Sequence, residues 1–196
     1  MPTHLYLIRH GKKRSEFGDP PLTDEGLLQA EKTAKHVATL PLHKIMSSPL
    51  LRTKQTADAI ALATKLVVEV VPLLRERVNW GDDPHQSYEA FEKMWRHASE
   101  DRTWMPPIGD SSQAAGKRVE SVIEHIHEAG GVALVTHGGV ICDFLRNVFT
   151  IEEMEMVRPG FSKEYEFGVL ECSITHVVLK KGDKPKLMKI ADVGHL

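Results

Sequence analysis

Two short segments of this chain share one pattern, in which an apolar run ends in a histidine followed by a glycine. The first is Leu7-Ile8-Arg9-His10-Gly11, and the second is Leu134-Val135-Thr136-His137-Gly138-Gly139. Open α/β folds place their sites at the carboxyl ends of strands, and a strand followed by His-Gly delivers a polar side chain there. Two matching segments therefore predict a single site that contains two imidazoles, those of His10 and His137.

Strand and helix signals alternate through the first half of the chain. Apolar runs predict strands at Leu5–Ile8, Ile45–Met46 and Val67–Pro72. Residues at helical spacing predict a helix that Thr23 caps and that ends before Pro41, and a second helix from Leu50 to Ala63. This alternation is typical of βαβ units and predicts an α/β fold with a largely parallel sheet.

The second half is expected to contain helices and strands in a less regular order. We predict helices at Ser87–Ser99, from Ser111 or Ser112 to about Ala129, and at Gly139–Asn147, and strands at Val132–Val135, Tyr165–Leu170, Ser173–Leu179 and Leu187–Ile190. Because no linker or repeat interrupts the chain, we expect one domain over residues 1–196. Residues 77–110 form an insertion or lid over the sheet edge in this prediction, with Trp80, His85, Tyr88 and Trp104 as candidates to line the mouth of a pocket.

The composition is that of an ordinary globular protein. Apolar residues make up 41% and charged residues 27% of 196 residues, and the net charge of −2 gives no support for nucleic-acid or membrane binding. We see no signal peptide and no apolar run near the ~20 residues that span a bilayer. Cys142 and Cys172 are expected to be buried thiols in a reducing compartment, so we expect a cytoplasmic protein, although a disulfide stays open.

Two arginines are predicted to join the histidines. Arg9 precedes His10, and Arg52 falls in the first turn of a predicted helix, near free backbone N–H groups. Guanidinium groups and a helix N-terminus both suit phosphate oxygens. Arg9, Arg52, His10 and His137 together therefore predict a site for a dianionic phosphoryl group.

An acid is needed if such a site is to cleave esters. Glu76 follows the third predicted strand and is the candidate, because its carboxyl can give a proton to a departing alkoxide and later activate water. Glu16, Glu69 and Asp82 also lie near predicted strand edges or loops and remain alternatives for this role.

An ordered set of motifs resembles the histidine phosphatase superfamily, the group that also contains cofactor-dependent phosphoglycerate mutase. The motifs are Leu7-Ile8-Arg9-His10-Gly11, Leu22-Thr23-Asp24-Glu25-Gly26 with Gln29-Ala30, Ser47-Ser48-Pro49-Leu50-Leu51-Arg52-Thr53 with Gln55-Thr56-Ala57, Leu74-Arg75-Glu76, Gly109-Asp110-Ser111 and Val135-Thr136-His137-Gly138-Gly139. The resemblance extends from about Leu5 to Cys172.

The resemblance implies a fold and a role for each residue. The implied fold is a three-layer α/β/α sandwich with a mostly parallel central sheet. His10 matches the nucleophile, which forms a phosphohistidine, and Glu76 matches the proton donor. Arg9, Arg52 and His137 match the residues that stabilise the phosphoryl group. No metal and no organic cofactor is implied. The implied activity is hydrolysis of a phosphate ester of a small metabolite or a protein.

One segment departs from the family pattern. Family mutases and many phosphatases have an acidic residue and then Thr or Ser after Arg-His-Gly, with Trp-Asn shortly after, whereas this chain has Lys12-Lys13-Arg14-Ser15 and no such Trp-Asn. The departure argues against a mutase and suggests a polyanionic or protein-borne phosphate, although a solvated loop would explain it too.

Three other functions remain open on the sequence alone. A mutase would return the phosphoryl group to a sugar-acid acceptor. A metal-dependent hydrolase would use His10, His137 and Glu76 as ligands and would lose activity with a chelator. A binding module would hold phosphorylated ligands without turnover. The sequence leaves the substrate and the oligomeric state open.

Overall fold

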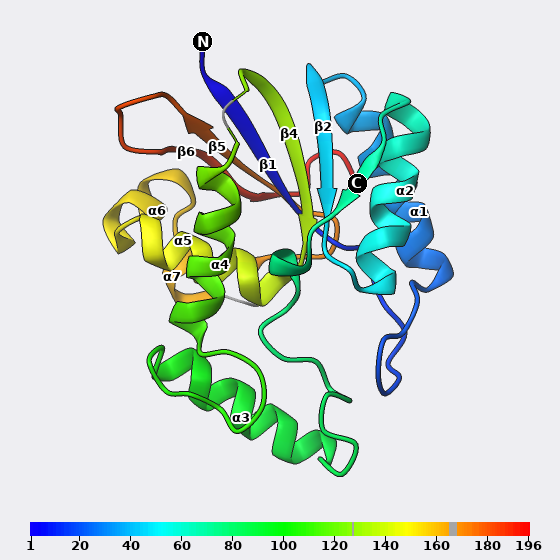
Figure 1. The fold of residues 1–196 in the computed structure, drawn as a ribbon, viewed down its shortest axis with the longest axis vertical. Coiled ribbons are helices and arrows are strands. Elements are labelled where there is room, and N and C mark those ends of the chain that lie inside the picture. The colour runs from blue at the N-terminus through cyan, green and yellow to red at the C-terminus, as the bar shows by residue number, and fades with distance from the viewer. Residues whose placement is uncertain (127, 165–167) are drawn as a thin grey trace.

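A six-stranded sheet forms the centre of the protein (Figure 1). The computed structural model describes residues 1–126, 128–164 and 168–196. The strands are β1 (Thr3–Arg9), β2 (Leu42–Ser47), β3 (Val68–Val70), β4 (Gly130–Thr136), β5 (Ile174–Leu179) and β6 (Lys186–Asp192). They lie in the order β3-β2-β4-β1-β5-β6, and β5 pairs antiparallel with both of its neighbours while the other pairs are parallel. The prediction of a mostly parallel sheet is confirmed. The antiparallel pairs of β5 with β1 and β6 make the sheet mixed at one end.

Helices cover both faces of this sheet, which confirms the three-layer sandwich (Figure 1). The helices α1 (Asp24–Val37) and α2 (Leu51–Thr64) lie on one face, and α4 (Ser112–Glu124) and α5 (Gly138–Val148) lie on the other. A short 3-10 helix, η1 (Pro72–Leu74), follows β3. The helix α3 (Tyr88–Glu100) stands apart, beyond the carboxyl ends of the parallel strands (Figure 1).

Alternation along the central strands divides the core into two layers. In β1, Leu5 and Leu7 join the cluster on the α4–α5 face, while Tyr6 and Ile8 join the cluster on the α1–α2 face. This follows from the period of two in a strand, since successive side chains point to opposite faces. A strand buried on both faces reads as a continuous apolar run, which is why β1 could be recognised from the sequence.

Side-chain caps set the starts of α1, α3 and α4. Thr23, Ser87 and Ser111 each accept a hydrogen bond from the backbone N–H three residues later, at the starts of α1, α3 and α4. Such caps satisfy N–H groups that have no partner inside the helix. Two of these caps, Thr23 and Ser111, are among those predicted.

Two glycines allow α1 to approach the end of β1. A Cβ on Gly11 would lie 2.5 Å from the carbonyl oxygen of Gly26, and a Cβ on Gly26 would collide with the carbonyl of Lys12. Because neither backbone position leaves room for a side chain, this contact accounts for the glycines of both motifs. It holds the loop after the first histidine against α1.

The carboxyl-terminal part differs from the prediction. The helices α6 (Ile151–Val157) and α7 (Phe161–Glu164) were not predicted. Residues 165–167 of the predicted strand Tyr165–Leu170 lie outside the described residues, and the rest of that segment is not a strand. The helix expected to reach Ala129 ends at Glu124, because Gly130 already pairs with Thr3 in the sheet.

Two further predictions concern the cysteines and the membrane. Cys142 and Cys172 are both buried, and neither is in a disulfide. None of the helices in the described ranges is long and apolar enough to cross a bilayer.

Candidate active site

The two predicted histidines meet at the carboxyl edge of the sheet. Arg9 pairs with Thr136 in the register of β1 and β4, so the residues that follow, His10 and His137, emerge side by side. The centroids of the two imidazoles lie 5.2 Å apart, with the rings inclined by 67°. Parallel pairing of β1 and β4 therefore brings together the two strand–His–Gly segments, as predicted.

The imidazole of His10 is held in one orientation. Its Nδ1 lies 2.7 Å from the carbonyl oxygen of Gly11, and the Nε–H of Arg52 points at its Nε2 at 3.1 Å. The carbonyl can only accept a hydrogen bond, so Nδ1 carries the proton and Nε2 presents its lone pair. Burial, Arg52 and then Arg9 hold the pKa of His10 well below its ordinary value, which keeps the ring neutral.

His137 lies at the start of α5 and is fully buried. Its Nε2 lies 2.8 Å from the hydroxyl of Ser48 at the end of β2. Its buried Nδ1 has no hydrogen-bond partner among the described residues. Burial, followed by the charge of Arg52 and the neighbouring His10 imidazole, lowers its pKa well below the ordinary value. A buried nitrogen without a partner next to His10 is a group that a ligand can satisfy.

Arg52 reaches the site from the first turn of α2, as predicted, and its side chain is 3% exposed. Besides His10, its guanidinium contacts Asp19 at 3.4 Å and the amide oxygen of Asn79 at 3.2 Å. The helix has no cap of its own, and both carboxylate oxygens of Asp19 accept the backbone N–H of Leu51, at 2.9 and 3.0 Å. Asp19 therefore fixes both the start of α2 and its arginine.

Arg9 lies at the same edge, but its guanidinium is partly engaged elsewhere. Its Nη1 donates to the carbonyl of Val169 at 2.5 Å, and its Nη2 pairs with Glu171 at 2.7 Å. A Cβ on Gly138 would lie 3.3 Å from Arg9 Cδ, so the arginine passes the start of α5. Its Nε is buried and has no partner among the described residues.

Glu76 follows η1 and reaches the start of α5, next to His137. Its Oε2 accepts the backbone N–H of Gly139 at 3.3 Å, and its Oε1 accepts that of Arg77 at 3.0 Å. A Cβ on Gly139 would meet the ring of Trp95 at 2.7 Å and Glu76 Oε1 at 2.9 Å, so the carboxyl lies close to that indole.

The three other acidic candidates contact groups other than the histidines. Glu16 lies 3.8 Å from Arg14 in its own loop, and Glu69 pairs with Lys44 at 2.9 Å. Asp82 accepts the backbone N–H of Asn79 at 2.8 Å. Glu76 is thus the candidate acid with direct contact to the segment that carries His137.

Sequence reasoning missed four residues that orient the site. Ser48 contacts His137, Asp19 and Asn79 hold Arg52, and Glu171 holds Arg9. Of these, Asp19 and Asn79 sit in polar loops and Glu171 precedes β5. No local pattern marks them, although the absence of a capping residue before Leu51 was a signal that another segment caps α2.

Three of the residues predicted to line the mouth of a pocket, Trp80, Tyr88 and Trp104, pack against other rings. The rings of Trp80 and Tyr88 lie 5.0 Å apart, and Phe17 contacts Trp80 at 5.4 Å. Trp104 instead stacks on His97 of α3 at 4.3 Å. The contacts from Phe17 through Trp80 to Tyr88 therefore join the loop after β1 to α3.

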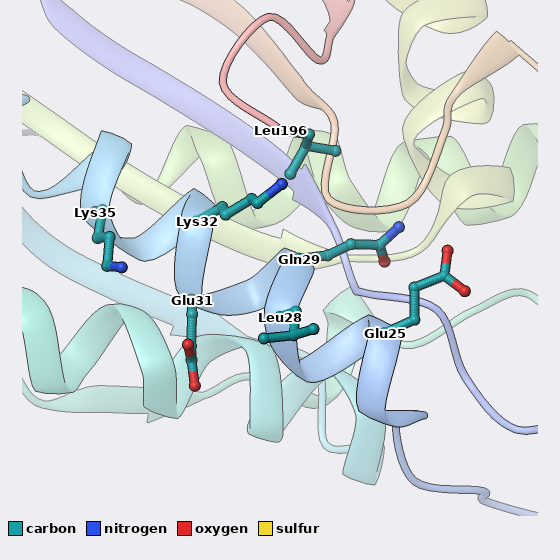
Figure 2. A pocket seen from close by; sticks show the side chains of 7 residues that line it. All are labelled: Glu25, Leu28, Gln29, Glu31, Lys32, Lys35 and Leu196. Atoms are coloured by element: carbon teal, nitrogen blue, oxygen red, sulfur yellow. The ribbon is translucent and has the colours of Figure 1, made fainter.

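A surface pocket of about 430 Å³ lies along α1 (Figure 2). Its lining residues are Glu25, Leu28, Gln29, Glu31, Lys32, Lys35 and Leu196. Figure 2 shows Lys32 extending toward Leu196, while Glu31 points away from it. None of the predicted site residues lines this pocket, so it is separate from the histidine pair.

No cluster of metal ligands was found in the described part of the chain. Groups of three or more His, Cys, Asp or Glu residues placed to hold a metal ion are absent from residues 1–126, 128–164 and 168–196. His10, His137 and Glu76 therefore do not form such a cluster there.

Comparison with known proteins gives one family. The profile of the Histidine phosphatase superfamily (branch 1) matches residues 5–191. Two curated relatives, from Yersinia pestis and Yersinia pseudotuberculosis, are both named probable phosphoglycerate mutase GpmB. Each is 34% identical to this chain over 149 residues, which cover 68% of this chain and 69% of the relative.

Solved structures of similar proteins share the fold. A mycobacterial glucosyl-3-phosphoglycerate phosphatase is 21% identical, with a TM-score of 0.76 over 97% of this chain and 99% of that one. Phosphoserine phosphatase from Entamoeba histolytica is 21% identical, with a TM-score of 0.73 over 98% of both chains. Phosphoglycerate mutase from Bacillus anthracis is 19% identical, with a TM-score of 0.71 over 99% and 95%. At these identities the likeness establishes the fold alone.

Proposed function

The chain belongs to the histidine phosphatase superfamily (branch 1), and we propose that it hydrolyses phosphate monoesters through a phosphohistidine formed on His10. The observation that carries the proposal is the orientation of this ring. With Nδ1 bound to the Gly11 carbonyl, Nε2 presents a lone pair beside Arg52 in a neutral imidazole. A neutral imidazole with an oriented lone pair is a competent nucleophile.

The first step transfers the phosphoryl group. The Nε2–P bond forms as the P–O bond to the leaving group breaks, and Glu76 gives its proton to the departing oxygen. A phosphoryl transition state spreads charge over three equatorial oxygens, so positioning and cationic groups supply most of the catalysis. Arg9, Arg52 and the unpartnered Nδ1 of His137 supply these groups, with Nδ1 carrying a proton as Nε2 accepts the Ser48 hydroxyl.

The second step returns the enzyme to its starting state. Water attacks phosphorus, Glu76 takes a proton from it, and the Nε2–P bond breaks to release inorganic phosphate. No metal takes part in this scheme, so the activity should resist a chelator.

A small phosphate ester is the proposed substrate, and the cytoplasm is the proposed location. The names of the similar proteins refer to phosphoglycerate, glucosyl-3-phosphoglycerate and phosphoserine, which are all small acids. Two buried thiols that form no disulfide fit a reducing compartment. Residues 77–110, which include α3 beyond the strand ends, are proposed to cover the site within a single domain.

Hydrolysis of p-nitrophenyl phosphate with and without EDTA tests the proposal. We expect chelator-resistant release of phosphate by the wild type, its loss in His10→Ala, and an unchanged rate in His125→Ala, whose imidazole is exposed. Quenching with alkaline detergent during turnover should trap base-stable, acid-labile phosphate on the wild type alone. Full activity in His10→Ala would refute the mechanism, and inhibition by EDTA would favour the metal-dependent alternative.

A mutase is the second candidate, because the 34% identical relatives are named probable phosphoglycerate mutases. Incubation with 3-phosphoglycerate separates the two functions. A hydrolase releases inorganic phosphate and glycerate, whereas a mutase forms the 2-phospho isomer with little free phosphate.

A further inference from the structure

The segment that carries Glu76 is held by its backbone carbonyl groups. After η1 ends at Leu74, the chain lies in neither a helix nor a strand. Even so, the carbonyls of residues 73–77 all accept hydrogen bonds from other groups. Irregular backbone cannot satisfy its own polar groups, so other parts of the chain must supply the donors. The position of Glu76 is therefore decided by the residues that supply them.

Arg118 supplies two of these donors from α4, which packs beside η1 (Figure 1). Its Nη1 donates to the carbonyl of Leu73 and, at 3.1 Å, to the carbonyl of Arg75. The side chain of Arg118 is 13% exposed. One nearly buried guanidinium thus holds the backbone immediately before Glu76.

Asp110 extends this contact to the other side of Glu76. Its Oδ2 lies 3.0 Å from Arg118 Nη2 and 2.8 Å from Arg75 Nη1. Its backbone N–H donates to the carbonyl of Arg77 at 3.0 Å. Arg75 Nη1 also donates to the carbonyl of Glu76 at 3.0 Å. Asp110 therefore joins the arginine of α4 to the residue that follows Glu76.

Thr136 links the same segment to the histidine pair. Its buried hydroxyl donates to the carbonyl of Leu74 at 2.6 Å. Thr136 directly precedes His137 in the chain, so the backbone around Glu76 is held in a fixed relation to that histidine.

An arginine suits this task because its planar fork of five N–H donors can contact two carbonyls and a carboxylate at once. General-acid catalysis requires the proton to lie within hydrogen-bond reach of the leaving-group oxygen. A displacement of about 1 Å can cost about 10²-fold in rate. A residue that fixes the backbone of Glu76 therefore bears directly on proton transfer.

We propose that Arg118 is a positioning residue for the general acid: with Asp110, it holds the backbone on both sides of Glu76 and so directs the Glu76 carboxyl toward the leaving-group oxygen. The inference rests on the proposed phosphatase function. It gives a role to the Gly109-Asp110-Ser111 motif and to α4, which the proposed mechanism does not use.

Two esters with different leaving groups separate positioning of the acid from general support of the fold. Benzyl phosphate releases an alkoxide that needs a proton, whereas p-nitrophenyl phosphate releases a stable phenolate. The value of kcat/KM reports the first step, in which Glu76 gives its proton, and is compared for wild type, Arg118→Met and Arg118→Lys. The matched control is Arg102→Met, since Arg102 also donates to two carbonyls, those of Asp143 and Arg146 in α5.

We expect Arg118→Met to lower kcat/KM for benzyl phosphate by about 10-fold or more and for p-nitrophenyl phosphate by less than about 3-fold. In a Glu76→Gln background, Arg118→Met should lower kcat/KM for benzyl phosphate by less than about 2-fold, because no proton remains to be positioned. Arg118→Lys keeps a cation for Asp110 and should show a smaller loss with the same selectivity. Arg102→Met should change both esters by the same factor.

Equal losses with both esters in Arg118→Met, or the same loss with and without Glu76, would overturn the inference. The same selectivity in Arg102→Met would also overturn it. Circular dichroism checks that each variant is folded. If Arg118→Met does not fold, Arg118→Lys decides, and an unchanged ratio of the two kcat/KM values there would overturn the inference. The proposed function fails separately, if wild type releases no phosphate from any ester or if His10→Ala remains active.

Discussion

Acidification should destabilise this protein through its two buried histidines. Burial, Arg52 and Arg9 hold the pKa of His10 well below 6.5, and burial, Arg52 and His10 do the same for His137. In the unfolded chain both rings are hydrated and titrate near 6.5. Below about pH 6.5 the unfolded state therefore binds more protons than the folded state, so stability present above this pH is lost as the pH falls.

The size of the loss follows from this linkage. A ring that takes up a proton only in the unfolded chain lowers the free energy of unfolding by about 1.4 kcal/mol between pH 7.5 and pH 5.5. The two rings together account for about 2.7 kcal/mol over that interval. Because domains are stable by only about 5–15 kcal/mol, the change is a large fraction of the total.

Urea unfolding at several pH values, followed by circular dichroism, measures the loss. His10→Gln keeps an acceptor for Arg52 but cannot titrate, so its free energy of unfolding should fall by about 1.4 kcal/mol less than that of the wild type. His125→Gln serves as the control, because it removes an exposed imidazole. Equal pH dependence in wild type and His10→Gln would refute the claim that the buried ring stays neutral.

Three further substitutions test single parts of the site. Glu76→Gln should lower kcat for an alkyl phosphate by about 10²–10⁴-fold and change p-nitrophenyl phosphate hydrolysis far less, because p-nitrophenolate leaves without a proton. Arg52→Gln should reduce kcat/KM by about 10²-fold and raise the pKa of His10, which NMR titration measures. Gly139→Ala should cost about 1–3 kcal/mol of stability in thermal or urea unfolding, because the new Cβ meets the ring of Trp95 at 2.7 Å.

Each of these predictions has a control and a contrary result. For Glu76→Gln, the alkyl phosphate and p-nitrophenyl phosphate serve as controls for each other. Equal losses of kcat with both esters would contradict proton donation by Glu76. For Arg52→Gln the control is Arg14→Gln, which removes an exposed arginine from the loop after β1. An equal loss of kcat/KM in Arg14→Gln would contradict a special role for Arg52. For Gly139→Ala the control is Gly194→Ala, whose new Cβ would lie 3.3 Å from Asp192 Oδ1 and should change the free energy of unfolding very little. A Gly139→Ala variant that is more stable than the wild type would contradict the close packing of Gly139 against Trp95.

The central fold could be predicted because its signals are local. β1 and β4 are continuous apolar runs buried on both faces, and Thr23 and Ser111 cap helices in the expected way. The meeting of His10 with His137 also followed, since neighbouring parallel strands end at one edge.

Helix boundaries were harder to predict where two signals competed. The predicted helix to Ala129 ran up to a glycine pair, the expected end of a helix, but Gly130 pairs with Thr3 and belongs to β4. Sheet pairing overrode the local pattern there. The start of α6 does have a signal in the sequence, since Thr150 and Glu153 form a reciprocal capping box. This signal was missed in the prediction.

The partners of the site arginines could not be predicted from any periodicity. Asp19 and Asn79 contact Arg52 from loops 33 and 27 residues away in the sequence. The conformation of the loops decides such contacts, and irregular loops have no periodic sequence pattern that predicts their path.

The engagement of Arg52 has a consequence for affinity. Three of the five N–H groups of its guanidinium already contact His10, Asp19 and Asn79. A phosphate that uses more than the two remaining N–H groups must exchange bonds with these partners, so the ground state gains little from those further contacts. The larger charge on the equatorial oxygens of the transition state gains more from the same exchange. The arginine thus favours turnover over retention, and inorganic phosphate, which gains only what the ground state gains, should be a weak product inhibitor.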